Sequence, residues 1–510
     1  SVQTTRLAQR EAEMLFHIGL SHWNRGQEPE KAADSFRSVL NKYPTSAEAE
    51  RARKILPEIY LTLAARQLGK GDVQAARENL QKIDGPDVPD SVRERVNTLE
   101  ARAVSVLYQR ATEAGDRQSV SKHFRNLVEN YPRTRPAQMA LRRRLGLESP
   151  AGRELFDEKT AEERYGEALE YMEELRFGAA RNMFRALVRH TAPTSEAARK
   201  ALEKLPECEY RLALRSLGRG EQTEFTEGLQ SLQKDYFYTD WADRAEATLQ
   251  RAEQTPRGMV FVPQGPFQMG TMRSELVNFL SAYYPKGVLA DEDQLELTLQ
   301  LEGYISEIPR HQSRTPAFYI DKTEVTNEEY EAFVEASGHR PPPEWENGTY
   351  PQGQGRLPVR GVTQSDAQAY AQWAGKRLPT EREWEKVARG TDGRRFPWGE
   401  DFDRTACVHM QKSDAGPEPV GSRPSGASPY GAMDMIGNVW EWTRSSFRAY
   451  REDAPEDMRV PYGPKHHVVR GGAWDQHHLK PVPVRAAFRL PVKPDQRNSD
   501  LGFRCVQDAR

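Results

Sequence analysis

One phrase recurs through the first half of the chain. It reads Phe36-Arg37-Ser38-Val39-Leu40 at its first occurrence and returns from Phe124 and Phe184, with weaker copies at Leu80 and Leu229. Successive anchors of this phrase are 44, 44, 60 and 45 residues apart, and helical segments closed by turns lie between them. One helix–turn–helix hairpin cannot bury its own apolar face, so hairpins of this kind stack. We therefore predict five stacked helical hairpins.

The end of the first copy carries a second signature. Tyr43-Pro44-Thr45-Ser46-Ala47 follows the apolar phrase. The phrase and the period together resemble tetratricopeptide-like repeats over about residues 8–252. The resemblance implies a concave surface that docks a protein or peptide. A plain helical spacer fits the same pattern, so both interpretations stay open.

The composition of the chain changes near residue 256. Ala, Glu, Arg and Leu dominate before it, whereas Gly, Pro and aromatic residues cluster after it, as in Phe396-Pro397-Trp398-Gly399. We predict an all-α repeat domain over residues 1–255 and an irregular domain of loops and short strands over residues 256–510. The fold class is therefore α+β.

Charge and hydropathy limit the partners. The 73 basic and 75 acidic residues give a formal net charge of −2, which provides no electrostatic attraction to nucleic acid. No apolar run reaches the roughly 18–20 residues of a membrane span. We expect no nucleic-acid partner and no direct membrane span in this chain.

A series of short phrases marks the second half. In chain order they are Gly265-Pro266-Phe267-Gln268-Met269-Gly270, Asp321-Lys322-Thr323-Glu324-Val325-Thr326-Asn327, Arg377-Leu378-Pro379-Thr380-Glu381, Gly437-Asn438-Val439-Trp440-Glu441-Trp442, Arg470-Gly471-Gly472 and Leu501-Gly502-Phe503-Arg504. Their order resembles the formylglycine-generating enzyme (sulfatase-modifying factor) family over about residues 257–508. The resemblance implies a compact variant of the C-type lectin fold. We expect the tryptophans of these phrases to pack in its core.

The cysteines bear on the family's chemistry. The chain holds only Cys208, Cys407 and Cys505. The resemblance implies a copper site made by two cysteines after the Gly-Gly turn, since soft thiolates suit Cu(I). Gln476 and Pro481 stand at those two positions. We therefore expect no copper site and no formylglycine production by the copper–thiolate route.

Other polar residues occupy the positions of the family's pocket. His477 and His478 lie beside Gln476, and imidazole suits Cu, Zn, Fe or Ni. Adjacent residues of an extended chain point to opposite faces, so we expect a loop role for this pair, with a bound metal as the alternative. Arg485 and Arg489 resemble family positions that line or support the pocket. An ion-paired framework explains them equally well.

A calcium site is implied by the same resemblance. The segment offers side-chain oxygens at Asp434 and Glu441 and backbone carbonyls at Gly437 and Val439. Hard oxygen ligands on one short curved segment suit Ca²⁺, and we predict a structural ion there. The alternative for Glu441 is a core carboxylate that accepts N–H groups.

An insertion separates two of the family's phrases. Residues 274–306 carry Leu276, Phe279 and Leu280 at helical spacing, followed by a second apolar segment. We expect a helical cap on the domain or on the repeats. The alternative is a helix that docks a partner.

The intact phrases beside the altered cysteine positions favour a non-catalytic interaction or scaffold protein. It would combine a helical-repeat arm for protein partners with a binding module. One alternative is a non-heme metal-dependent oxidase or oxygenase of the same family, acting on a protein or thiol substrate. Another is an assembly factor that holds a client peptide. The resemblance implies a bacterial, periplasmic or cell-surface protein.

Overall fold

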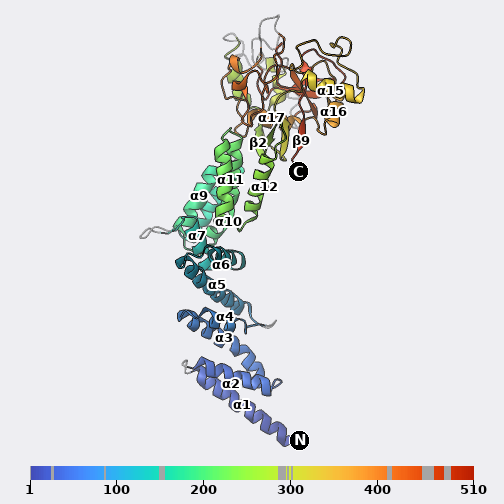
Figure 1. Ribbon diagram of the computed structural model, residues 1–510. Helices are drawn as coiled ribbons and strands as arrows, with labels where there is room; N and C mark the ends of the chain where they lie inside the picture. Colours follow the sequence, from blue (N-terminus) through green and yellow to red (C-terminus); the bar gives the residue numbers. More distant parts are fainter. Residues whose placement is uncertain are drawn as a thin grey trace. The chain divides into compact units, whose positions relative to one another are not determined.

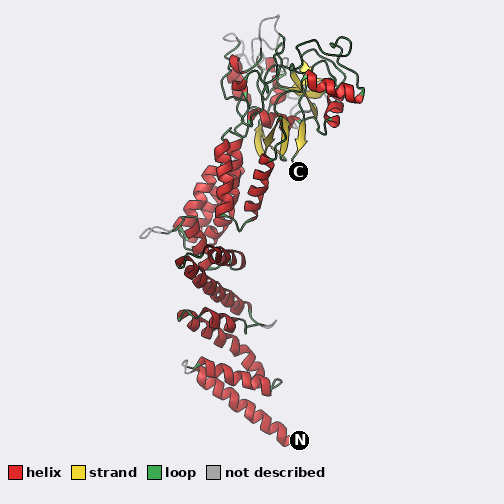
Figure 2. Ribbon diagram, viewed as in Figure 1, coloured by secondary structure: helices red, strands yellow, loops and turns green. Residues whose placement is uncertain are grey.

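The computed structural model describes residues 2–24, 28–84, 88–148, 155–284, 295, 298–299, 303–409, 416–450, 465–475 and 484–509. They form two compact units. The repeat unit comprises Ser1–Cys208 with Asp235–Asp240, and the C-terminal unit comprises Glu209–Lys234 with Trp241–Arg510. Helices fill the first, and the described strands all lie in the second (Figure 2).

Helices of the repeat unit pack on their neighbours in sequence (Figure 1). They are α1 (Val2–Asn24), α2 (Pro29–Lys42), α3 (Ala47–Gly69), α4 (Val73–Leu80), α5 (Asp90–Glu113), α6 (Arg117–Asn130), α7 (Arg135–Arg144), α8 (Glu158–Glu173) and α9 (Phe177–His190). Next come α10 (Glu196–Leu217), α11 (Gln222–Asp235) and α12 (Asp240–Glu253). The predicted helical region is confirmed.

The five sequence anchors share one structural position, because each lies on the second helix of a pair and is buried. They are Phe36 on α2, Leu80 on α4, Phe124 on α6, Phe184 on α9 and Leu229 on α11. Helix α7 adds an element between the third and fourth anchors. This extra helix accounts for the longer spacing there.

Close contact between α1 and α2 explains one glycine. A Cβ at Gly19 would lie 2.9 Å from Cε1 of the Phe36 ring. Glycine on α1 therefore lets the helix approach a fully buried phenylalanine, which also meets Phe16 edge to face at 5.3 Å between ring centroids. The hairpins are held by such apolar contacts.

Short strands and long loops build the rest of the C-terminal unit. The strands are β1 (Met259–Val262), β2 (Gly265–Met269), β3 (His311–Thr315), β4 (Phe318–Asp321), β5 (Trp440–Ser446), β6 (His467–Arg470), β7 (Leu490–Val492), β8 (Leu501–Gly502) and β9 (Val506–Asp508). They form sheets in the orders β1-β4-β9, β2-β3 and β7-β6-β5-β8. All pairings are antiparallel except β5 with β8.

Three helices of this unit begin in the same way. They are α15 (Asn327–Ser337), α16 (Gln364–Trp373) and α17 (Glu381–Arg389). Each has a threonine N-cap, at Thr326, Thr363 and Thr380, whose hydroxyl accepts from the third helical N–H while that residue's carboxylate bonds back. This capping box satisfies two N–H groups at each helix start.

The described part of the insertion packs into the core of its own domain. Helix α13 (Arg273–Leu280) buries Leu276, Phe279 and Leu280 in the cluster that contains Trp440 and Trp442. This packing supports the cap interpretation. The tryptophans at 384, 440 and 442 are at most 2% exposed, as expected for the core, whereas Trp398, expected there too, is half-buried against the same cluster.

By its contacts, the C-terminal unit also includes the last helical hairpin. The Thr391 N–H donates to the carbonyl of Gly218 at the end of α10, and the Tyr319 hydroxyl donates to the carbonyl of Arg251 on α12 at 2.9 Å. Sequence alone assigns this hairpin to the repeats. The boundary at residues 255/256 stays a prediction. None of the described helices has the length and apolarity that crossing a membrane requires.

Candidate functional site

Helix α17 is both highly charged and buried. Glu381, Glu383, Glu385, Lys386 and Arg389 are each at most 5% exposed. A buried charge without a partner costs several kcal/mol, so each of these groups needs one. The helix contacts β2, β3, β5 and β6, and the partners come from these strands and the loops that follow them.

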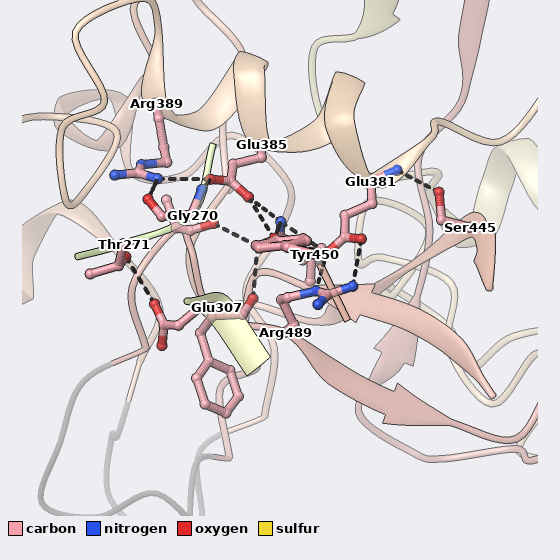
Figure 3. Close-up of polar contacts among 12 residues, drawn as sticks. Gly270, Thr271, Glu307, Glu381, Glu385, Arg389, Ser445, Tyr450 and Arg489 are labelled. Atoms are coloured by element: carbon pink, nitrogen blue, oxygen red, sulfur yellow. Dashed lines mark hydrogen bonds and ion pairs between the residues drawn. The ribbon is translucent and has the colours of Figure 1, made fainter. Parts of the chain in front are cut away.

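Glu385 lies between two arginines (Figure 3). One carboxylate oxygen accepts from Arg389 Nη1 and from the Gly270 N–H, both at 2.7 Å, and the other pairs with Arg470 Nη2. Burial alone would raise the pKa of Glu385, but Arg470 and Arg389 hold it below its ordinary value. Gly270 has φ of +78°, and a Cβ there would lie 2.7 Å from the Pro309 carbonyl oxygen. Only glycine fits at position 270, whose N–H donates to Glu385.

Glu381 joins a third arginine to this buried network. It accepts from Arg489 Nε at 2.5 Å and Nη2 at 3.0 Å, and it also pairs with Arg470 at 3.1 Å. Arg489 donates further to the carbonyls of Ser306 and Arg448. The sequence left Arg489 as a pocket or framework residue, and these contacts make it part of the framework.

Tyr450 completes the network. Its hydroxyl lies 3.4 Å from a carboxylate oxygen of Glu381 and of Glu385 (Figure 3). Burial raises the pKa of Tyr450 well above its usual value, and the Glu381 charge raises it further. The hydroxyl therefore stays protonated and serves as a donor to the carboxylates.

Glu307 and Arg485 form a second buried pair beside the first. Arg485 Nη1 and Nη2 donate to the two carboxylate oxygens of Glu307 at 2.9 and 2.6 Å. The Thr271 hydroxyl donates to the same carboxylate at 3.1 Å. Two parallel hydrogen bonds fix the orientation of the guanidinium.

A polar cavity of about 260 Å³ lies against this second pair. It is lined by Thr271, Glu275, Phe279, Arg310, Arg389, Asp392, Gly393, Arg395, Glu400, Arg485 and Ala487. Arg485 is thus both a pocket residue and an ion-paired one. The other predicted pocket residues, Gln476, His477 and His478, lie outside the described residues, as does Pro481.

The network is a framework more than a reactive centre. Each carboxylate in it accepts from at least one guanidinium, so neither Glu381 nor Glu385 is placed as a general base. The guanidiniums also donate to backbone carbonyls, as Arg470 does to Ala486 and Phe488 at 3.0 and 2.9 Å. The arrangement fixes loops that are far apart in sequence.

The thiols do not fit the family's copper chemistry. Cys208, Cys407 and Cys505 are all buried, and none forms a disulfide. Burial raises the pKa of Cys407 to about 12 and that of Cys505 well above its ordinary value. Without a bound metal these two groups therefore stay protonated thiols, and neither lies at the two positions, 476 and 481, that the resemblance assigns to the copper ligands.

The predicted calcium ligand Glu441 already has partners. Its two oxygens accept from Arg504 Nη2 and Nε, both at 2.7 Å, and one also accepts from the Trp384 indole N–H at 2.7 Å. Glu441 is thus a core carboxylate that accepts N–H groups, which is the alternative that the sequence left open. Coordination of Ca²⁺ by Glu441 stays a prediction, and it would bring the ion close to a guanidinium.

A different acid lies beside Asp434. Glu324 is 1% exposed, and neither of its oxygens has a hydrogen-bond donor among the described residues. Burial and then the Asp434 charge raise the pKa of Glu324 well above its ordinary value. Arg504 is a cation beside Glu324, Asp434 and Glu441, so these three carboxyls carry excess negative charge whenever all of them are ionised. Glu324 and Asp434 therefore offer side-chain oxygens of the kind that a hard cation such as Ca²⁺ prefers. No described group of three or more His, Cys, Asp or Glu side chains is placed to hold a metal ion.

Sequence reasoning found some of these partners and missed others. Arg377 pairs with Glu383 nearby in sequence, with N–O distances of 2.8 and 2.7 Å, whereas Lys376 pairs with the distant Asp321. Glu324 was missed as a buried carboxyl beside Asp434, although it stands inside one of the quoted phrases.

Comparisons with known proteins find similarity in both halves of the chain. The family model for the sulfatase-modifying factor enzyme 1-like domain matches residues 245–509, and a tetratricopeptide repeat model matches residues 13–46. The chain is 31% identical to hercynine oxygenase of Mycolicibacterium smegmatis, over 49% of this chain and 61% of that protein. It is 33% identical to the formylglycine-generating enzyme of Streptomyces coelicolor, over 50% of this chain and 91% of that protein. The chain therefore spans about three fifths of the length of the hercynine oxygenase. Among solved structures, Treponema denticola variable protein 1 aligns over 49% of this chain and 94% of its own, at 20% identity and a TM-score of 0.35.

Proposed function

The chain belongs to the sulfatase-modifying factor enzyme 1-like family, and from this premise we propose that it is a non-catalytic interaction protein. The observation that carries the proposal is the closed network around α17. Its carboxylates are all held by arginines, and its arginines also bind backbone carbonyls. Such a site can hold a ligand, and among the described residues Glu381 and Glu385 are both bound by guanidiniums and so are not placed as general bases.

The altered cysteine positions support the same proposal. Gln476 and Pro481 cannot supply thiolates, and burial keeps Cys407 and Cys505 protonated. Formylglycine production through a copper–thiolate pair therefore has no ligand set in this chain.

The repeat unit would supply the protein contact. A tetratricopeptide model matches its first hairpin, and stacked hairpins of this kind bind peptides and proteins. We place the protein in the periplasm or on the cell surface, as the family resemblance implies. The C-type lectin description of the second unit belongs to the same proposal.

Calcium would have a structural role. Bound by Glu324, Asp434 and neighbouring carbonyls, it would balance the excess negative charge beside Arg504. Ca²⁺ would supply no redox chemistry there.

The second candidate is an oxygenase, because relatives include a protein named hercynine oxygenase. In that case His477 or His478 would contribute to an iron or copper site, and the substrate would be a protein or a thiol. A third candidate is an assembly factor whose client peptide occupies the cavity near Arg485.

Metal analysis and oxygen uptake separate these functions. The full-length protein would be purified and supplied with iron(II) or copper(I), and metal content and oxygen consumption with a sulfatase-derived cysteine peptide or with free thiols would be measured. We expect calcium only and no oxygen consumption. One equivalent of iron or copper that disappears in the His477→Ala/His478→Ala double variant, together with substrate oxidation, would overturn the interaction-protein proposal.

A further inference from the structure

The cavity beside Arg485 is built partly from the insertion. Helix α13 contributes Glu275 and Phe279, and the segment after α17 contributes Arg395 and Glu400. Its volume of about 260 Å³ is close to the lower end of the roughly 300–1,000 Å³ that small-molecule sites occupy. The space suits one acidic side chain or a small organic acid.

The Phe279 ring lies between two guanidiniums of the cavity wall. The Cζ atoms of Arg395 and Arg485 are 4.9 and 5.1 Å from its centroid. Cation–π contacts of this kind hold arginines in place and keep water from one face of each. The insertion therefore orders the cationic wall of the cavity.

Two donors in this wall have no acceptor in the described part of the chain. They are the Nε atoms of Arg485, whose side chain is 3% exposed, and of Arg310. A buried N–H without an acceptor is costly, and an acceptor on a ligand would satisfy it. The other nitrogens of Arg485 are bound to Glu307, so its Nε is already oriented.

Glu275 shows which kind of group binds the Arg310 guanidinium. Its carboxylate pairs with Arg310 Nη2, and its side chain is 38% exposed. A carboxylate on the insertion thus already lies at one of the two arginines. An incoming carboxylate would add to this contact or replace it.

The charges of the lining favour a monoanion. Four arginines and three acids face the cavity, the acids being Glu275, Asp392 and Glu400. A dianionic phosphate would meet more repulsion from these acids than a carboxylate would. The aromatic face of Phe279 would contact the carbon atoms of an acidic side chain.

We propose that this cavity binds the carboxylate group of an acidic ligand, through Arg310 and Arg485. The inference deepens the proposed interaction function by naming the ligand class of the C-terminal domain. The carboxylate could belong to an acidic residue of a peptide or to a free organic acid.

Calorimetric titration of the full-length protein tests this proposal. The probes are Ac-Gly-Glu-Gly-NH₂, its glutamine counterpart Ac-Gly-Gln-Gly-NH₂, and glutarate. We expect the glutamate peptide or glutarate to bind at least tenfold more tightly than the glutamine peptide. Binding of the peptide with weak glutarate binding identifies a peptide source, and the reverse identifies a free acid.

Matched variants locate the site. Arg310→Gln should weaken binding at least tenfold, whereas Glu275→Gln should strengthen it, because it removes the competing carboxylate. Arg314→Gln, at an exposed position of β3, the strand that follows Arg310, should leave binding unchanged. Thermal unfolding of each variant would check that its fold is intact.

Equal affinity for the glutamate and glutamine peptides would overturn the proposal, as would absence of binding by all three probes. So would binding that Arg310→Gln leaves unchanged. These outcomes would leave the interaction-protein proposal standing, since that proposal depends on metal content and oxygen uptake.

Discussion

The two units of the molecule use charge in opposite ways. Ion pairs of the repeat unit lie on its surface, as between Lys54 and Glu50, whose side chains are 77% and 71% exposed. In the C-terminal unit the side chains of Arg470 and Glu385 are fully buried and 85 residues apart in sequence. Apolar contacts between neighbouring helices hold the repeats, whereas buried ion pairs join the distant loops of the second unit. The C-terminal unit, with its short strands and long loops, thus depends on buried ion pairs to hold its loops in place.

The largest effect should come from the buried network. Glu385→Gln keeps the shape of the side chain but leaves Arg389 without its carboxylate and Arg470 with Glu381 alone. We expect the C-terminal unit to lose about 3–5 kcal/mol of unfolding free energy. Urea unfolding followed by near-ultraviolet circular dichroism would measure it.

The control for this change is Glu50→Gln on the repeat unit, where an exposed i,i+4 pair contributes about 0.5 kcal/mol at most. Equal losses for the two variants would contradict the contrast between the units.

Calcium removal should have the next largest effect. If Glu324 and Asp434 hold the ion, free calcium at 100 times its Kd stabilises the fold by about 2.7 kcal/mol. EGTA should therefore lower the melting temperature of the wild-type protein, and Glu324→Gln should reduce that response. Differential scanning calorimetry with and without calcium would record it.

The pH dependence in EGTA gives a second measurement of the same site. The folded pKa of Glu324 lies above its unfolded value, so the folded state binds more protons once the pH exceeds about 4.3. The unfolding free energy in EGTA should therefore fall as the pH rises above about 4.3. Glu324→Gln should remove this fall, and a profile that the variant leaves unchanged would contradict our assignment.

Apolar packing in the repeat unit should give a smaller effect. Gly19→Ala places a Cβ 2.9 Å from the Phe36 ring, and we expect a loss of about 1–3 kcal/mol from overpacking. Gly166→Ala on α8 meets no atom within 4 Å and should gain about 0.4–1 kcal/mol. Thermal unfolding of both variants would compare them, and a loss at both positions would show that helix packing does not distinguish these glycines.

The last prediction concerns the buried lysine of α17, whose effect depends on pH. Burial lowers the pKa of Lys386 to about 7, although its Nζ donates to the Pro263 carbonyl and the Thr315 hydroxyl. The unfolded lysine keeps its proton up to about pH 10.4, so between pH 7 and that value the unfolded state binds more protons. Unfolding free energy should rise with pH there, by at most about 1.4 kcal/mol per pH unit from this group.

Lys386→Met should remove that part of the rise. Urea unfolding of wild type and variant at pH 6.5 and pH 9.5 would isolate it. Identical pH profiles would mean that Lys386 stays charged in the folded protein up to pH 9.5, which would contradict its lowered pKa.

The sequence predicts helices and their caps better than it predicts which charged side chains pair with each other. The recurring apolar phrase located the second helix of each repeat pair, because a 3.6-residue period is a local property. The three threonine N-caps have equally local signals. By contrast, Arg489, Arg470 and Arg485 lie 85 to 178 residues in sequence from the carboxylates of Glu381, Glu385 and Glu307 that they bind, and no local pattern specifies these pairs. Glu324 was missed for the same reason, since only folding brings it beside Asp434.

The buried thiols have a practical consequence for labelling chemistry. Alkylating and maleimide reagents attack the thiolate, and two of the three native cysteines have pKa values far above neutral. With all three enclosed, the native cysteines should stay unmodified in the folded protein. A single cysteine placed on an exposed repeat helix could then carry a dye or spin label without removal of the natural ones.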